Sequence, residues 1–220
     1  MDHLVDGVGT AVWTPRTEKI RSVFERTRNC ITKYRDDFRN DDGSRAAELV
    51  DLANKIAKDA DKLPIDGSGE AKVYRWFTVS RAHTLAALAE DLLARKGTDA
   101  SNSRRNYALE QRQAACSTAL QANEKAMTLL DSNPWPGFEE MMIPEISLYD
   151  RVLCLTINAM SAPDGEQVKA FDDARYAYNK HERDYTEWHE QSKLKDEPLV
   201  RLLLSRSRMD DGNQNNLSRP

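Results

Sequence analysis

The stretch from Gly69 to Ala94 constrains the fold most, because it holds the longest uninterrupted helical pattern in the chain. Its apolar residues recur at spacings that place them on one face of an α-helix. These residues are Val73, Phe77, Leu85, Leu88 and Leu92. The Pro, Asp and Gly residues of 64–69 are typical of a turn that ends one helix and starts the next. Glu70 suits the dipole of a first helical turn. The sequence therefore predicts one long helix here, ending near Gly97.

The rest of the chain carries further helical patterns and no alternating strand pattern. The predicted helices cover 14–39, 45–62, 106–131, 138–160, 166–193 and 197–209. We expect Pro144 to kink or split one of them, and the polar segment 97–106 to form a loop. The fold class predicted is all-α, an antiparallel stacked array of about seven helices. Residues 14–209 would form one domain, 1–13 a loose N-terminal arm and 210–220 a disordered tail.

Composition excludes several classes of function. The net charge of −4 argues against a general nucleic-acid binder. No apolar run reaches the roughly 18 residues of a membrane span, and we see no signal peptide, so we expect no membrane partner. The three cysteines are odd in number and irregularly spaced, which predicts free, unlinked thiols in a reducing compartment. We therefore expect a cytoplasmic protein.

No motif indicates catalysis, a metal or a cofactor. We find no Ser-His-Asp or Cys-His spacing and no Gly-rich phosphate loop, which predicts a protein that is not an enzyme. His181, Tyr185 and His189 share one helical face, but two turns separate the histidines. Zinc sites on one helix usually use histidines one turn apart, so no metal site is predicted.

The first predicted helix carries a basic stripe, because Arg21, Arg28 and Arg35 are spaced by sevens. Neighbouring guanidinium groups on one face bind a dianionic phosphate through fork-like hydrogen bonds. The alternative is a solvated flank whose arginines pair with carboxylates such as Glu25 and Asp36.

Segments of three predicted helices resemble the 14-3-3 family. Residues 69–74, GEAKVY, resemble the opening run of that family's central helix, and 87–90, ALAE, resemble its close. Residues 169–174, KAFDDA, resemble a run in the family's penultimate helix. Residues 194–207, LKDEPLVRLLLSRS, resemble its final helix.

The resemblance implies a groove that binds a phosphorylated segment. Arg21 and Arg28 match the basic pair of the family's groove helix, with Arg replacing Lys, and Leu199 and Leu203 match the apolar wall. Both leucines are alternatively plain core residues. The central helix departs from the family, because the positions of its basic phosphate ligands hold other residues, so Arg81 is either a substitute ligand or a paired structural residue.

The function predicted is that of a non-enzymatic signalling adaptor that binds phosphoserine- or phosphothreonine-containing protein segments in an amphipathic groove. The alternative is a helical scaffold that binds protein segments without recognising phosphate. The family's dimer interface comes mostly from two helices that have no counterpart before Thr14, so we expect a monomer or a weak dimer.

Overall fold

The computed structural model describes residues 17–65, 68–97, 101–132, 142–186 and 197–206. These residues form helices joined by short connections, with no strand among them, which confirms the predicted all-α array. In chain order the elements are α2 (Glu18–Lys33), α3 (Arg35–Asn40), α4 (Ala46–Asp61), α5 (Gly69–Lys96), α6 (Asn102–Ser132), α8 (Ile143–Ser161), α9 (Asp164–Asp184) and a last helix over 198–206.

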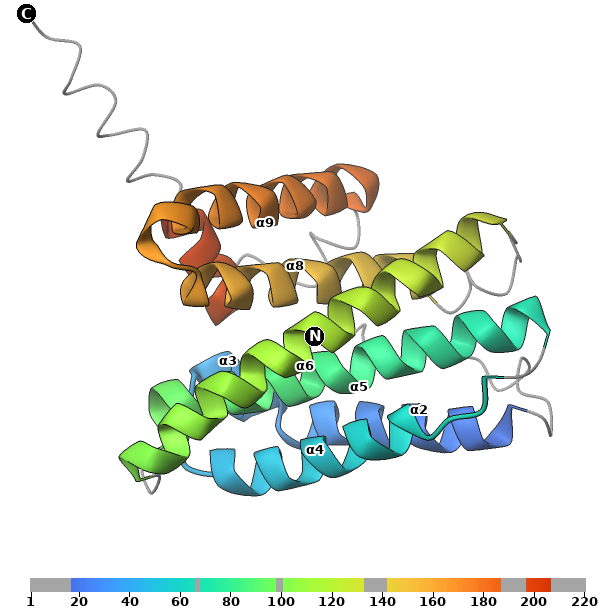
Figure 1. Ribbon diagram of the computed structural model, residues 1–220, viewed down its shortest axis with the longest axis horizontal. Coiled ribbons are helices and arrows are strands. Elements are labelled where there is room, and N and C mark those ends of the chain that lie inside the picture. The colour runs from blue at the N-terminus through green and yellow to red at the C-terminus, as the bar shows by residue number, and fades with distance from the viewer. Residues whose placement is uncertain (1–16, 66–67, 98–100, 133–141, 187–196, 207–220) are drawn as a thin grey trace, which may run out of the picture.

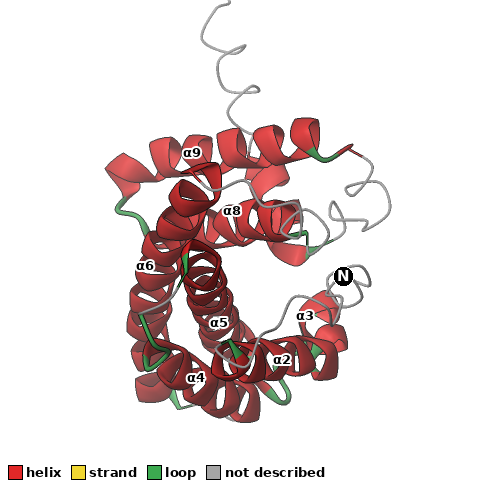
Figure 2. Ribbon diagram, turned by 90° about the vertical axis from the view of Figure 1, so that its right-hand side faces the viewer, coloured by secondary structure: helices red, strands yellow, loops and turns green. Residues whose placement is uncertain are grey.

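The two longest helices, α5 and α6, pack along each other at the centre of the array (Figure 1). Helices α2 and α4 pack on one side of α5, and α8 joins α5 and α6 to α9 on the other. Seen from the end, the helices curve around an open concave side (Figure 2). One arm of this curve consists of α2, α3 and α4, and the other of α8 and α9.

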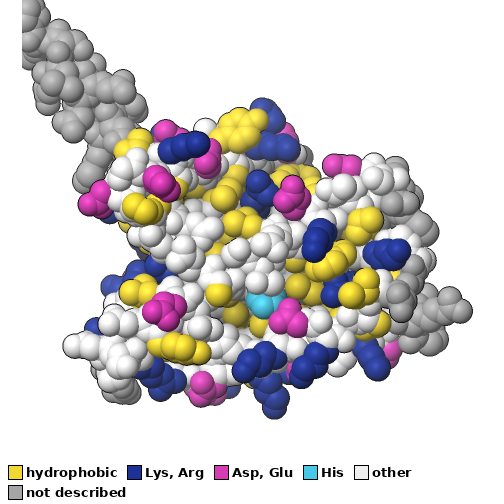
Figure 3. Space-filling view, in the orientation of Figure 1, with side chains coloured by type: hydrophobic (Ala, Val, Ile, Leu, Met, Phe, Trp, Pro, Cys, Tyr) yellow, Lys and Arg dark blue, Asp and Glu magenta, His cyan; other side chains and the backbone are white. Residues whose placement is uncertain are grey.

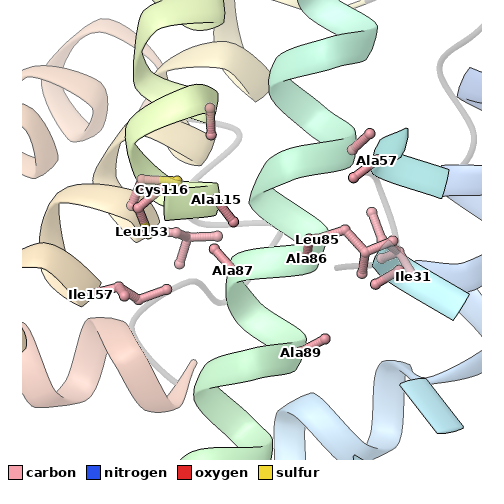
Figure 4. Packing of buried hydrophobic residues seen from close by; sticks show 14 of the residues in the cluster. Ile31, Ala57, Leu85, Ala86, Ala87, Ala89, Ala115, Cys116, Leu153 and Ile157 are labelled. Carbon is pink, nitrogen blue, oxygen red and sulfur yellow. The ribbon is translucent and has the colours of Figure 1, made fainter. Parts of the chain in front are cut away.

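The predicted central helix is confirmed as α5, which begins and ends where its sequence indicates. The Ser68 hydroxyl accepts a hydrogen bond from the Ala71 N–H at 3.3 Å, which caps the first turn, and the last turn is basic. The five residues of the predicted apolar face lie in or against the core, and α5 is also buried on nearly every other side. Figure 4 shows Leu85 and Ala86 facing α2 and α4, with Ala87 on the side of α8. Small alanines let neighbours approach α5 on several faces at once.

The first predicted helix is broken at Tyr34, which separates α2 from α3. The Tyr34 ring is fully buried, and the cations of Lys33 and Arg45 each lie 4.8 Å from its centre. The apolar face predicted for α2 is confirmed, since Ile20 and Phe24 are both in the core. The expected cap at Thr14 lies outside the described residues.

The start of α6 differs from prediction. Helix α6 starts at Asn102, inside the predicted loop, since the Ser101 hydroxyl accepts a hydrogen bond from the Arg104 N–H at 3.2 Å. Pro144 lies in the first turn of α8, where its missing N–H costs no helical hydrogen bond. Residues 138–141, which the predicted split would separate from α8, lie outside the described residues.

The second half of the array also departs in places from the predicted pattern. Helix α9 spans Asp164–Asp184, and residues 187–193 of the predicted helix lie outside the described residues. The side chains of Leu109 and Val168 are 41% and 58% exposed, so neither belongs to the core as predicted. The arm over 1–13 and the tail over 210–220 lie outside the described residues, and these domain boundaries stay predictions.

All three cysteines are free and buried. Cys30 lies on α2, whereas Cys116 and Cys154 lie on α6 and α8. Burial raises the pKa of the Cys30 thiol to about 11. For Cys116, contact with the Cys154 thiol and burial both raise the pKa. Both thiols are therefore protonated at neutral pH.

Candidate functional site

A shallow groove opens where α3, α5, α8 and the start of the last helix meet, and the cavity at its floor has a volume of about 30 Å³. Its apolar lining is contributed by Phe38, Leu88, Leu92, Tyr149, Leu153, Pro198 and Leu199. Its charged lining is contributed by Asp41, Asp91, Arg95 and Glu197. The same helices border the concave side seen in Figure 2. Apolar contacts with a few fixed charges are the usual composition of a binding site.

The charged wall of the groove is an ion-pair network centred on Arg95. Its guanidinium donates to Asp91 at 2.7 Å and to Asp41 at 2.8 Å, which joins α5 to the residue that ends α3. The buried Asp91 also accepts from Arg112 of α6 at 2.6 Å, and Arg112 donates in turn to Ser161 of α8. Burial disfavours the charged form of Arg95, but Asp91 and Asp41 more than offset it and raise its pKa. The charged side chains of this wall are therefore held in place by their ion pairs, and their charges largely cancel.

The groove lining also includes Glu197, which is 7% exposed and lies 4.0 Å from the Arg39 guanidinium. Asp41 adopts a left-handed backbone conformation, with φ 54°, at the end of α3. Asp and Asn tolerate this conformation better than most residues. This turn directs the chain from α3 toward α4 beside the end of α5, where Lys96 also binds Asp41 at 3.1 Å.

Arg81 lies on the same face of α5 as two groove residues, because Arg81, Leu88 and Arg95 are spaced by sevens along the helix. It is buried and forms an ion pair with the buried Asp150 of α8. The second carboxylate oxygen, Oδ2, accepts no hydrogen bond from the described residues. Burial raises the Asp150 pKa to about 6, against the lowering effect of Arg81. Of the two interpretations of Arg81, this geometry favours the paired structural residue.

The two arginines of the predicted basic pair lie on α2 and are not among the residues that line the groove. Arg21 pairs with Glu25 at 3.6 Å, and its side chain is 34% exposed. Arg28 is partly buried and has contacts of its own. The predicted apolar wall divides in two: Leu199 lines the groove, whereas Leu203 is fully buried in the core.

Sequence reasoning missed most of the charged lining. Arg95 was detectable, because its spacing of seven from Leu88 and fourteen from Arg81 places all three on one face of α5. Asp41 was not detectable as a groove residue, since its position depends on the turn after α3. Asp91 and Arg112 meet only through the packing of α5 against α6.

Two further hollows are present. One lies between α4, α5 and α6, where the His83 Nε2 is 2.8 Å from an Asp61 carboxylate oxygen. The other lies between α6, α8 and α9 and includes Tyr176, which is 75% exposed. On the face shown in Figure 3, charges of both signs alternate with scattered apolar side chains, with no field of one sign.

No cluster of three or more metal-ligating side chains occurs in the part of the chain that the structure describes. His181 is fully buried, with its Nε2 3.0 Å from the Glu145 carbonyl oxygen and its ring beside Tyr149 and Tyr185. His189 lies outside the described residues. None of the described helices combines the length and the apolar character that crossing a bilayer requires.

The fold and the groove together define an all-α protein with a concave, partly apolar binding surface. Comparison with protein-family models, with curated proteins and with solved structures gives no significant match.

Proposed function

We propose that this protein is a non-enzymatic interaction module that holds a segment of another protein in the groove between α3, α5, α8 and the last helix. The observation that carries the proposal is the lining itself, an apolar floor bordered by a charged wall whose ion pairs are already made. Prearranged walls reduce the ordering cost of binding. Paired charges favour orientation of a partner over catalysis. Free, buried cysteines fit a cytoplasmic location.

The partner segment should present apolar anchors to Leu88 and Leu153 and polar groups to Arg95 and Glu197. An amphipathic segment meets these requirements, as in helix-in-groove recognition. The charged wall would then fix the direction of the segment, and the apolar floor would supply most of the affinity.

A second candidate is recognition of a phosphorylated segment, which the basic stripe on α2 favours. Arg21 and Arg28 share one face and are both partly exposed. Against it, Arg21 already pairs with Glu25, and Arg81 already pairs with Asp150. A phosphate would have to displace or share such pairs, so we place this candidate second.

The experiment is a titration of a peptide library in matched phosphorylated and plain forms, with Leu88→Gln and Leu109→Gln as paired variants. Leu88 lines the groove, whereas Leu109 is a 41% exposed leucine on α6 outside it. Losing one buried leucine contact should weaken binding by about tenfold or more in Leu88→Gln. Leu109→Gln should bind like the wild type. Equal affinities of all three proteins for every bound peptide would reject the groove.

The same titration decides the second candidate. Phosphorylated peptides should bind more tightly than their plain forms, less so at high salt, and Arg21→Ala with Arg28→Ala should remove the difference. Equal binding of the phosphorylated and plain peptides by the wild type would reject phosphate recognition, and the phosphate-independent interaction module would remain.

A further inference from the structure

The hollow between α4, α5 and α6 shares no lining residue with the groove and has a volume of about 210 Å³. Sites for drug-sized ligands measure about 300–1,000 Å³, so this hollow suits a smaller molecule. Alanines leave the space open, because their side chains are too short to fill it: Ala57, Ala86, Ala114 and Ala115. The polar and charged lining consists of Asn54, Lys58, Asp61, His83, Tyr107, Gln111 and Thr118.

The His83 ring presents an accessible acceptor nitrogen at this hollow. Its Nε2 lies 2.8 Å from the Asp61 Oδ1. A carboxylate only accepts hydrogen bonds, so in the neutral imidazole the proton is on Nε2 and Nδ1 carries a lone pair. Nδ1 has no hydrogen-bond partner among the described residues, and it is not one of their enclosed polar atoms, so a ligand can reach it. Asp61 therefore holds His83 in the tautomer that accepts from a ligand.

Lys58 and Asp61 line the hollow with opposite charges that do not pair with each other. They lie three residues apart on α4, a spacing at which opposite charges on a helix commonly meet. Instead, the half-exposed Asp61 contacts the His83 ring and forms no ion pair with a lysine or arginine of the described residues. The exposed Lys58 likewise pairs with no carboxylate in the described ranges. The hollow thus presents a positive and a negative group that have not neutralised each other.

We propose that this hollow binds a small zwitterion, a free α-amino acid. The carboxylate of the amino acid pairs with the Lys58 ammonium, and its ammonium donates to the His83 Nδ1, where the Asp61 carboxylate behind the ring stabilises the positive charge. A simple anion would leave Asp61 without a cation, and a simple cation would leave Lys58 without an anion. The side chain of the amino acid lies against the alanines. Because the hollow and the groove have no lining residue in common, this site stands independently of the groove's function.

The test is a calorimetric titration of the full chain with each of the common free amino acids at neutral pH, up to millimolar concentration. The amino acid that binds most tightly is then compared with two of its own derivatives. Its N-acetyl form lacks the ammonium, and its amide lacks the carboxylate. Each derivative should bind at least about tenfold more weakly than the free amino acid, because each loses one charge-assisted contact. No saturable binding of any amino acid, or equal binding of the free and derivatised forms, would overturn the proposal.

Two pairs of variants place the binding in this hollow. Lys58→Met should weaken it by about tenfold or more, whereas Lys55→Met, which removes an exposed lysine of α4 outside the hollow, should bind like the wild type. Ala114→Leu should block the hollow without changing its charge, whereas Gln113→Leu adds a leucine at the neighbouring exposed position of α6, which does not line the hollow. All four positions are exposed, so the variants should fold. Affinity equal to the wild type in Lys58→Met or in Ala114→Leu would refute this site.

Discussion

At the scale of single residues, the Arg81–Asp150 pair is the clearest case in which the structure separates a structural role from a binding role. Sequence reasoning identified Arg81 as a charged residue on an apolar face, and its partner could not be inferred because the two residues lie 69 positions apart. The same limit applies to Arg21, whose partner Glu25 is one turn away and was predicted as an alternative. Ion pairs within one helix are detectable from residue spacing, whereas ion pairs between helices become visible only once the packing of the helices is known.

Breaking the buried pair should destabilise the fold strongly. Arg81→Met or Asp150→Leu alone leaves an uncompensated buried charge, which costs about 3–5 kcal/mol. The double variant removes both charges and should recover most of that loss. Urea denaturation of the wild type, both single variants and the double variant measures the coupling. If the single variants are as stable as the wild type but no longer bind peptide, Arg81 is a binding residue rather than a structural one.

The pH dependence of stability should carry a signature of Asp150. Burial raises its pKa from an ordinary value of 3.8 to about 6, so between these values the folded state holds a proton that the unfolded chain has released. This contribution to the unfolding free energy is complete below pH 3.8 and is lost as the pH rises through 6. The wild type should therefore lose about 3 kcal/mol relative to Asp150→Asn between pH 3.5 and pH 7. Parallel stability curves for the two proteins would contradict the raised pKa.

At the scale of elements, helix existence and type follow from apolar periodicity, and helix ends follow from local caps. The periodicity of 69–96 predicted α5 correctly, because a long pattern averages over many residues. The start of α6 was missed, since the polar segment 97–106 offers several capping residues, among them Ser101 and Ser103, and any of them was a plausible cap. The break at Tyr34 was missed because the apolar period continues across it.

The connection between α3 and α4 depends on a close approach that only glycine permits. A Cβ atom on Gly43 would lie 2.2 Å from the Lys96 carbonyl oxygen at the end of α5. Gly43→Ala must therefore displace one backbone from the other and should cost about 1–3 kcal/mol. Gly165 in the first turn of α9 has nothing within 4 Å of its added Cβ, so Gly165→Ala should stabilise the protein by about 0.5–1 kcal/mol. Thermal unfolding of the two variants checks the opposite signs, and a neutral Gly43→Ala would be evidence against this contact.

At the scale of the whole molecule, the groove follows from the curvature of the array, which no single helix pattern encodes. The resemblance of the final segment placed Leu199 and Leu203 together, but only one of them lines the groove. The curvature arises where α5 meets α4 on one side and α8 on the other, so the lining combines residues from four elements.

We expect the protein to be a monomer at about 10 μM. The large apolar side chains exposed in the described ranges are distributed over the connection after α4, α6 and α9, and scattered apolar residues are normal on a monomer surface. Multi-angle light scattering should give a mass near the 25.0 kDa of one chain. A stable dimer at that concentration would show that one of these faces is an interface.

The buried thiols offer a way to observe the array opening. All three are buried in the folded state, so an alkylating reagent reacts only during transient exposure of the helix that carries the thiol. Cys30 reports on the arm built from α2 and α4, whereas Cys116 and Cys154 report on the packing of α6 with α8. Equal labelling rates at the three positions would mean that both arms of the curve open in one cooperative unit. Faster labelling of Cys30 alone would mean that the two arms are separate units, so that the groove between them widens without global unfolding.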